Sequence, residues 1–166
     1  MSQSHANKQA ASVSERRFVF SKFCFYGFGV AGIGAGVGGR RRVDILCEKE
    51  FAALGWEVRV ATEDGSHGEK GLVTQPLLTE LRTPNSELRT PKLYACGPTP
   101  MLKAVAKIAE DFNLPCELSM DEHMCCGVGV CLTCVIPVKS GDGWEYQRTC
   151  TEGPVFDSRQ IVWEKA

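Results

Sequence analysis

The chain has 166 residues and a mass of 18.2 kDa, which suits one domain or two small ones. It carries 19 basic and 20 acidic residues, a formal net charge of -1, so no positive field attracts nucleic acid and a nucleic-acid binder is disfavoured. The 9 cysteines are an odd number, which excludes a closed disulfide framework, and no clear secretory signal opens the chain. We therefore interpret the cysteines as metal ligands or as free thiols in a reducing compartment.

The N-terminal region begins with a polar stretch and then becomes apolar. We interpret residues 1–17 as a disordered tail, because the stretch has few large apolar side chains. The uncharged segment Phe23–Gly39 could be a membrane span or part of a signal peptide. It has 17 residues, however, where a span needs about 20, and 7 of them are glycine. Membrane insertion is therefore disfavoured.

A glycine motif lies inside this segment. Residues Gly27–Gly32 fit the pattern G-x-G-x-x-G and follow an apolar run, Phe18–Tyr26. A dinucleotide-binding fingerprint needs a helix directly after the motif, and the further glycines up to Gly39 would weaken such a helix. Two interpretations stay open: a dinucleotide-binding loop, or a flexible glycine loop.

The middle of the chain alternates between helical and strand patterns. A short helix is predicted over Glu48–Leu54, stopped by Gly55, and the alternating residues Glu57–Thr62 predict a strand. Residues Glu63–Ser66 predict a turn, and Leu72–Leu81 a second short helix. This order is typical of an α/β protein.

A further strand, turn and helix follow. The segment Lys92–Ala95 predicts a buried strand, and Cys96, Gly97 and Pro98 form the turn after it. We expect Thr99 to cap the next helix. Its predicted buried face consists of apolar residues at helical spacing: Leu102, Val105, Ile108, Ala109 and Phe112. This is one βα unit of a parallel sheet.

The last third of the chain carries a cysteine cluster. Its members are Cys126, Cys131, Cys134 and Cys150. Their spacing, C-x4-C-x2-C followed by 15 residues and the last cysteine, is the plant-type [2Fe–2S] ligand spacing. Gly127 and Gly129 permit the positive φ angles that a loop around a cluster needs, and neighbouring N–H groups can donate to the sulfurs.

A predicted β-hairpin explains the distant fourth ligand. Two strand-like runs, Cys134–Lys139 and Trp144–Thr149, flank the glycine-rich turn Ser140–Gly143. Such a hairpin places Cys134 roughly opposite Cys150. Pro137 cannot donate to a ladder, so its strand is predicted to be an edge.

The cysteines also allow other interpretations. A structural zinc site is the main rival, but zinc usually takes two short-spaced ligand pairs and only one short cluster is present. Cys125 could compete with Cys126, yet it would lengthen the first interval to five residues, so we interpret it as a bystander. Three further cysteines are predicted to be small buried hydrophobes: Cys24, Cys47 and Cys116.

Several of these segments together resemble one family. Residues Glu122–Cys134 resemble the cluster loop of the electron-transfer subunit of dihydroorotate dehydrogenase B, and Arg148–Phe156 resemble its last-ligand motif. Residues Tyr94–Leu102 are similar to its Cys-Gly-Pro turn, which lies near the nicotinamide, and Ala61–Gly71 also match. The resemblance covers roughly Val43–Trp163.

The resemblance implies a fold and a set of cofactor contacts. It implies an α/β protein with a partial parallel-sheet, ferredoxin-reductase-like nucleotide-binding domain over residues 18–115 and a small β-rich [2Fe–2S] domain over residues 116–166. The expected metal ligands are Cys126, Cys131, Cys134 and Cys150. The expected cofactor contacts are Asp64, Gly65, Cys96, Gly97 and Pro98.

The resemblance also implies a function. Electrons from dihydroorotate oxidation by a catalytic subunit would pass through the [2Fe–2S] cluster and FAD to NAD, in cytoplasmic pyrimidine biosynthesis. Family members open with a flavin-binding barrel that nothing before Phe18 can supply, so the chain is expected to be truncated, to retain little FAD and to be inactive alone. No side chain is assigned as acid, base or nucleophile. The alternatives are the iron–sulfur reductase subunit of a sulfhydrogenase-type flavoprotein and a non-catalytic zinc-binding module.

Overall fold

The computed structural model describes residues 15–21, 34–82, 89–120 and 122–166. In these residues the larger sheet contains seven strands: β1 (Glu15–Ser21), β2 (Gly34–Gly39), β3 (Glu57–Thr62), β4 (Glu69–Lys70), β5 (Arg89–Cys96), β6 (Cys116–Ser119) and β9 (Val155–Asp157). The smaller sheet pairs β7 (Val135–Ser140) with β8 (Gly143–Arg148). The helices are α1 (Glu48–Ala53), α2 (Thr74–Arg82) and α3 (Thr99–Asp111), with a 3-10 turn, η1, at Arg42–Asp44.

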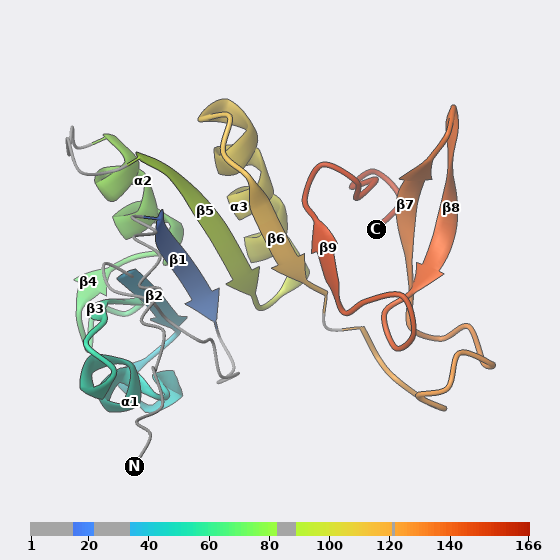
Figure 1. The fold of residues 1–166 in the computed structure, drawn as a ribbon. Coiled ribbons are helices and arrows are strands. Elements are labelled where there is room, and N and C mark those ends of the chain that lie inside the picture. Colours follow the sequence, from blue (N-terminus) through green and yellow to red (C-terminus); the bar gives the residue numbers. More distant parts are fainter. Residues whose placement is uncertain (1–14, 22–33, 83–88, 121) are drawn as a thin grey trace, which may run out of the picture.

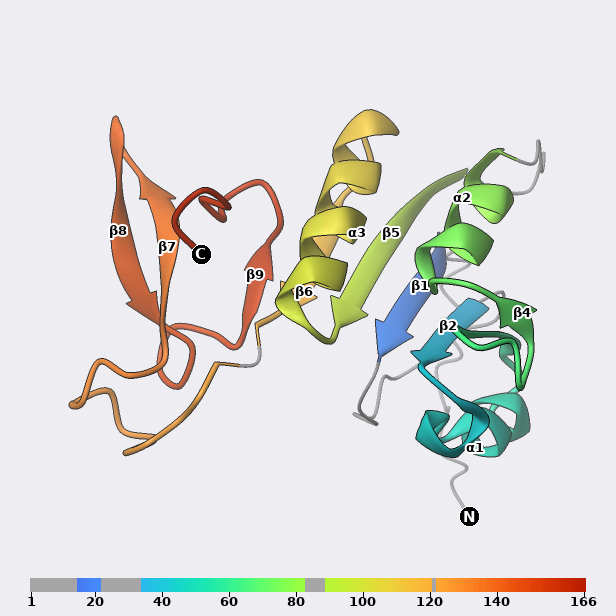
Figure 2. The same cartoon turned by 180° about the vertical axis from the view of Figure 1, so that it is seen from behind.

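The larger sheet is almost entirely parallel. Its strand order is β4-β3-β2-β1-β5-β6-β9, and only the last pair, β6 with β9, is antiparallel (Figure 1). Parallel neighbours need crossover connections, and α2 and α3 supply them on one face, as Figure 2 shows. The predicted α/β class, with a small β-rich unit after the parallel sheet, is confirmed.

Strand β2 separates two apolar layers. Ala35 and Val37 point to one face, where they pack in a cluster with Phe51 of α1. Gly38 points to the other face, because a Cβ added to it would lie 2.7 Å from Cβ of Val73, a member of the larger core. Helix α1 therefore covers the opposite face of the sheet from α2 and α3.

Helix α3 buries four of the five residues of the predicted apolar stripe, with Leu102, Val105 and Ala109 at 0–1% exposure. The prediction for Phe112 is wrong, because it follows the last helical turn as the C-cap and is 37% exposed. The prediction that Thr99 caps the helix is wrong. Pro98 occupies the cap position in an extended conformation, and its carbonyl oxygen accepts hydrogen bonds from the amides of the first turn. The ring of Pro98 already fixes φ at -61°, so the turn after β5 enters the helix without a side-chain cap.

One apolar core joins the parallel sheet to the β7–β8 hairpin. It contains Leu93 and Leu118 of the sheet together with Ile136 and Val138 of β7. Phe156 of β9 lies in the same core, and Figure 1 shows β9 between β6 and the hairpin. The hairpin is therefore packed against the sheet rather than attached only by the chain.

The parallel sheet crosses the predicted domain boundary. Strand β6 follows residue 115 and pairs with β5, and β9 extends the same sheet from beyond the hairpin. The division into residues 18–115 and 116–166 stays a prediction. Residues 15–17, expected at the end of the tail, belong to β1.

The glycine motif at residues 27–32 and Cys24 lie outside the described residues. The segment that follows the motif, Gly34–Gly39, is strand β2 and not the helix of a dinucleotide-binding fingerprint. Cys116 is buried, as predicted, but Cys47 is half-buried and is part of a disulfide bond, so its prediction as a small buried hydrophobe is wrong. Within the described part of the chain, no helix is both long and apolar enough to cross a bilayer.

Two turn glycines give a direct test of the β3–β4 connection. Both have positive φ, +68° at Gly68 and +80° at Gly55, but a Cβ at Gly68 would lie 2.1 Å from the Val60 carbonyl oxygen while Gly55 has open space. We expect Gly55→Ala to lower the free energy of unfolding by about 1 kcal/mol and Gly68→Ala by about 3 kcal/mol or more. Urea unfolding followed by circular dichroism measures both. Equal losses would contradict the close approach at Gly68.

Candidate metal centre

The β7–β8 hairpin places the third and fourth predicted ligands side by side. Its register pairs Val135 with Arg148 and Ser140 with Gly143, and the ladder continues past the strands, where the Thr149 amide donates to the Cys134 carbonyl oxygen at 2.8 Å. Cys150 follows directly. The predicted hairpin is confirmed, and it turns a gap of 15 residues in sequence into a contact between neighbouring backbones.

The first two predicted ligands lie on a tight loop before the hairpin. Gly127 and Gly129 have φ angles of +68° and +80°, as predicted for a loop that wraps around its own ligands. The amides of Val128 and Cys131 both donate to Sγ of Cys126, each at 3.5 Å. The backbone of the loop is therefore already turned toward a sulfur.

Hydrogen bonds in this loop favour the thiolate form of both cysteines. The hydroxyl of Thr133 donates to Sγ of Cys131 at 3.2 Å, and this contact is the main reason that the pKa of Cys131 is lowered to about 6. The amide of Val128 is the main cause of a lowered pKa at Cys126. Metal binding requires the deprotonated sulfur, so the hydrogen bonds of this loop favour the form of both cysteines that binds a metal cation.

The four cysteines lie in two pairs. In the first, the amide of Cys131 donates to Sγ of Cys126 at 3.5 Å, and in the second the Cys150 thiol is the main cause of a lowered pKa at Cys134. The guanidinium of Arg148 donates to the carbonyl oxygen of Gly129 at 3.2 Å, which joins the first pair's loop to the turn that holds Cys150. Among the described residues, no three His, Cys, Asp or Glu side chains are grouped around a single ion position.

Two pairs fit a two-iron cluster better than they fit one zinc ion. Each iron of a [2Fe–2S] rhomb takes two thiolates, whereas a structural zinc draws four ligands to one point. Thr149 adds a second sign of fit: its Oγ1 is buried and has no hydrogen-bond partner in the described part of the chain. The side chain of Thr149 contributes to the lowered pKa of Cys134, after the larger effect of Cys150, so this hydroxyl lies near a proposed ligand.

Exposure differs between the pairs. Cys134 is buried and Cys150 half-buried, whereas Cys131 is exposed and so is the neighbouring Cys125. Large apolar side chains around the first pair are also exposed: Met124, Val128, Val130 and Leu132. The sequence pattern does not predict this exposed apolar rim, because the residue types alone suit a buried loop as well.

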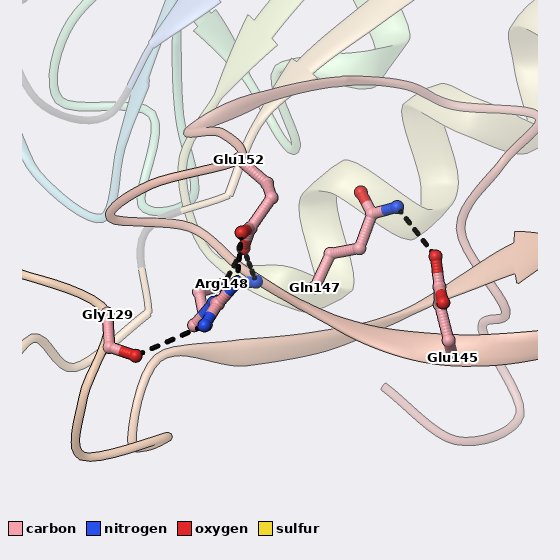
Figure 3. A network of polar contacts seen from close by, with 5 residues as sticks. All are labelled: Gly129, Glu145, Gln147, Arg148 and Glu152. Carbon is pink, nitrogen blue, oxygen red and sulfur yellow. Dashed lines mark hydrogen bonds and ion pairs between the residues drawn. The ribbon is translucent and has the colours of Figure 1, made fainter.

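Sequence reasoning also missed an ion pair beside the fourth ligand. The guanidinium of Arg148 contacts the carboxylate of Glu152 and, at 3.2 Å, the carbonyl oxygen of Gly129 (Figure 3). Arg148 lowers the pKa of Glu152 to about 2, so the carboxylate is charged at all ordinary pH values. Opposite charges four residues apart around Cys150 were the available sequence signal.

A cavity of about 310 Å³ lies at the carboxyl edge of the parallel sheet. Its lining includes Gly39, Arg40, Glu63, Gly71, Pro98 and Met101. Cavities of α/β proteins at this edge commonly hold ligands. Of the five predicted cofactor contacts, Pro98 lines the cavity, and Cys96 and Gly97 lie directly before it at the end of β5.

The other two predicted contacts, Asp64 and Gly65, shape the β3–β4 turn. Oδ1 of Asp64 accepts hydrogen bonds from the amide and the hydroxyl of Ser66, at 2.9 and 2.6 Å, and the hydroxyl contact is the main cause of a lowered pKa at Asp64. Gly65 has a φ of +75°. Neither residue is among those that line the cavity.

Comparison with known proteins agrees with this geometry. Residues 121–162 match the iron-sulfur cluster binding domain of dihydroorotate dehydrogenase B. The chain is also similar to the electron transfer subunits of this enzyme. It is 42% identical over 125 residues to "Dihydroorotate dehydrogenase B (NAD(+)), electron transfer subunit" of Caldanaerobacter subterraneus subsp. tengcongensis, covering 75% of this chain and 47% of the relative. The subunit of the same name from Bacillus caldolyticus is 45% identical over 127 residues, covering 76% and 45%.

The chain therefore spans about half the length of the curated relatives that it matches. A chain from a solved structure of NADH-dependent reduced ferredoxin-NADP oxidoreductase has the same fold, with a TM-score of 0.68 at 24% identity. This similarity covers 90% of the present chain and 54% of the other. The resemblance to dihydroorotate dehydrogenase B subunits is confirmed.

The two loop glycines are expected to differ in importance. A Cβ at Gly129 would lie 3.0 Å from Cγ2 of Thr151, whereas a Cβ at Gly127 has no neighbour within 4 Å. Both positions carry the same φ strain, so Gly127→Ala is the matched control for Gly129→Ala. We expect Gly129→Ala to lower the iron content of the purified chain at least about 10-fold more than Gly127→Ala does. Iron analysis measures both, and equal iron contents would argue against close contact between the two loops.

Neighbouring cysteines test the choice of first ligand. Amide groups point at Sγ of Cys126, and Cys125 is exposed. We expect Cys126→Ala to abolish the visible absorption of the cluster and Cys125→Ala to leave it unchanged. The reverse pattern would assign the first ligand to Cys125 and a five-residue interval to the loop.

Proposed function

We propose that the chain binds a [2Fe–2S] cluster through Cys126, Cys131, Cys134 and Cys150. One observation carries the proposal: the hairpin register brings the backbone around Cys134 and Cys150 together, beside a loop whose amides donate to Sγ of Cys126. The plant-type spacing and the family match at residues 121–162 support it.

The wider role that we propose is electron transfer in a dihydroorotate dehydrogenase B. The chain would work in a hetero-oligomer with a catalytic dihydroorotate-oxidising subunit, in the cytoplasm, and would carry electrons toward NAD in pyrimidine biosynthesis. The names of the related subunits support this role. The apolar rim at Val128, Val130 and Leu132 supports a partner at the cluster loop, since such patches are usually covered.

Nucleotide contacts belong to the same proposal. Pro98, with Cys96 and Gly97 before it, would lie against a nicotinamide or flavin at the cavity, while Asp64 and Gly65 would hold the β3–β4 turn beside it. Support comes from the position of the cavity at the carboxyl edge of the sheet. The side chain of Arg40, also in the lining, supplies positive charge for an anionic nucleotide.

The protein's own groups would position these cofactors. When bound, a [2Fe–2S] cluster exchanges single electrons and a flavin converts them into the pair that NAD takes as hydride. The amides of Val128 and Cys131 would stabilise negative charge on the first ligand pair. Burial of Cys134 against the core would keep water from the second pair.

The test is the metal and sulfide content of the full chain, purified without air. We expect about two irons and about two acid-labile sulfides per chain, with a brown colour. Addition of dihydroorotate and a dihydroorotate-oxidising subunit should reduce the cluster, as seen by bleaching of its visible absorption. Stoichiometric zinc without sulfide would refute the iron–sulfur assignment. A normal cluster that this subunit does not reduce would refute only the wider role.

A further inference from the structure

Arg148 uses every polar group of its backbone to close the turn around Cys150. Its carbonyl oxygen accepts the amides of Thr151, Glu152 and Gly153 at 3.3, 2.9 and 3.3 Å. Its own amide donates to Oε2 of Glu152 at 2.7 Å. Residues 148–153 therefore form one hydrogen-bonded turn, with the fourth proposed ligand inside it.

The side chain of Arg148 connects this turn to the other ligand loop. Nε donates to Oε2 of Glu152 at 2.9 Å, and Nη2 contacts the second carboxylate oxygen. Nη1 points the other way and donates to the carbonyl oxygen of Gly129 at 3.2 Å. Figure 3 shows the guanidinium between the carboxylate and the loop that carries Gly129.

Gly129 is thereby held against the turn around Cys150 on two sides. Its carbonyl oxygen accepts a hydrogen bond from Nη1 of Arg148 at 3.2 Å. The space beside its Cα is filled by Thr151, whose Cγ2 lies 3.0 Å from where a Cβ would stand. Gly129 is thus the junction between the two cysteine pairs, and the Arg148–Glu152 ion pair fixes that junction.

We propose that Arg148 and Glu152 are positioning residues for the cluster: their ion pair sets the separation of the two cysteine pairs and thereby holds a bound cluster in place. This rests on the proposed function. A planar guanidinium can serve a carboxylate with one edge and a carbonyl with another nitrogen, which a single lysine ammonium cannot do in the same geometry.

An ordinary surface ion pair would not have this effect. The Arg148 and Glu152 side chains are 38% and 32% exposed, and pairs of such exposure contribute little to folding stability. The proposed effect therefore concerns cluster retention and not the stability of the fold. Glu145 provides the matched control, because it accepts a hydrogen bond from Gln147 at 3.2 Å within strand β8 of the same hairpin, apart from the contact between Arg148 and Gly129 (Figure 3).

The experiment compares Arg148→Ala, Arg148→Lys, Glu152→Gln and the control Glu145→Ala in the full chain. Cluster loss is followed by visible absorption after addition of an iron chelator, and the reduced cluster is examined by electron paramagnetic resonance. We expect the variants Arg148→Ala, Arg148→Lys and Glu152→Gln to lose the cluster at a rate about 10-fold or more above the wild-type rate. We also expect the g values of their reduced clusters to shift or the resonance lines to broaden. Glu145→Ala should match wild type in both measurements.

The outcomes separate the two proposals. A wild-type chain without iron and sulfide would overturn the proposed function, and this inference with it. A stable wild-type cluster with Arg148→Lys and Glu152→Gln indistinguishable from Glu145→Ala would overturn the positioning role alone. Far-UV circular dichroism of the cluster-free variants checks folding. Should Arg148→Ala not fold, the two conservative variants decide, since Glu152→Gln keeps the size of the side chain and Arg148→Lys keeps its charge and aliphatic stem.

Discussion

The register of the β7–β8 hairpin is the constraint on which the proposed centre depends. Four sulfurs must converge from two segments, and only the pairing of Val135 with Arg148 puts Cys134 beside the residues that lead to Cys150. A slip by one residue would turn alternate side chains to the other face of the strand and separate the second cysteine pair. The two-residue turn at Gly141, with φ of +52°, and the burial of Ile136 and Val138 both oppose such a slip.

Burial of the hairpin also fixes the centre relative to the parallel sheet. The apolar side of β7 shares a core with Leu118 of β6 and Phe156 of β9, so the candidate metal centre and the sheet form one packed body. Strand β9 has a double role in this arrangement: it completes the sheet at β6, and it follows directly on the turn that contains Cys150. Packed side chains, among them Leu118 and Phe156, therefore connect the sheet to the hairpin that carries the proposed ligands.

Local patterns in the sequence predicted the elements well, and tertiary contacts account for what they missed. The alternation in Glu57–Thr62, the stripe of α3 and the glycine-rich turn of the hairpin each depend on neighbours in sequence, and the structure has all three. The cap of α3 was misplaced because residue type favours Thr99 as the cap, whereas the helix begins at Thr99 and follows Pro98, whose φ is fixed by its ring. The contact from Arg148 to Gly129 joins residues 19 positions apart, and no periodic pattern in the sequence predicts it. The metal ligands and cofactor contacts remain predictions, supported by geometry.

The two cysteine pairs differ in environment in a way that suits electron transfer. The Cys134 side faces the apolar core, which keeps water away, whereas Cys131 lies at the surface within a rim that includes Val128 and Val130, at 68% and 79% exposure. A chain that exposes apolar residues around its proposed cofactor forgoes the free energy of burying them. Another protein surface that covers the rim would regain this free energy of burial. The same contact would shorten the distance over which an electron moves between the two proteins. The exposed rim and the more buried second pair are therefore complementary parts of one proposed role. The rim would bind a partner, and the Arg148–Glu152 ion pair would keep the ligands in place when the partner binds.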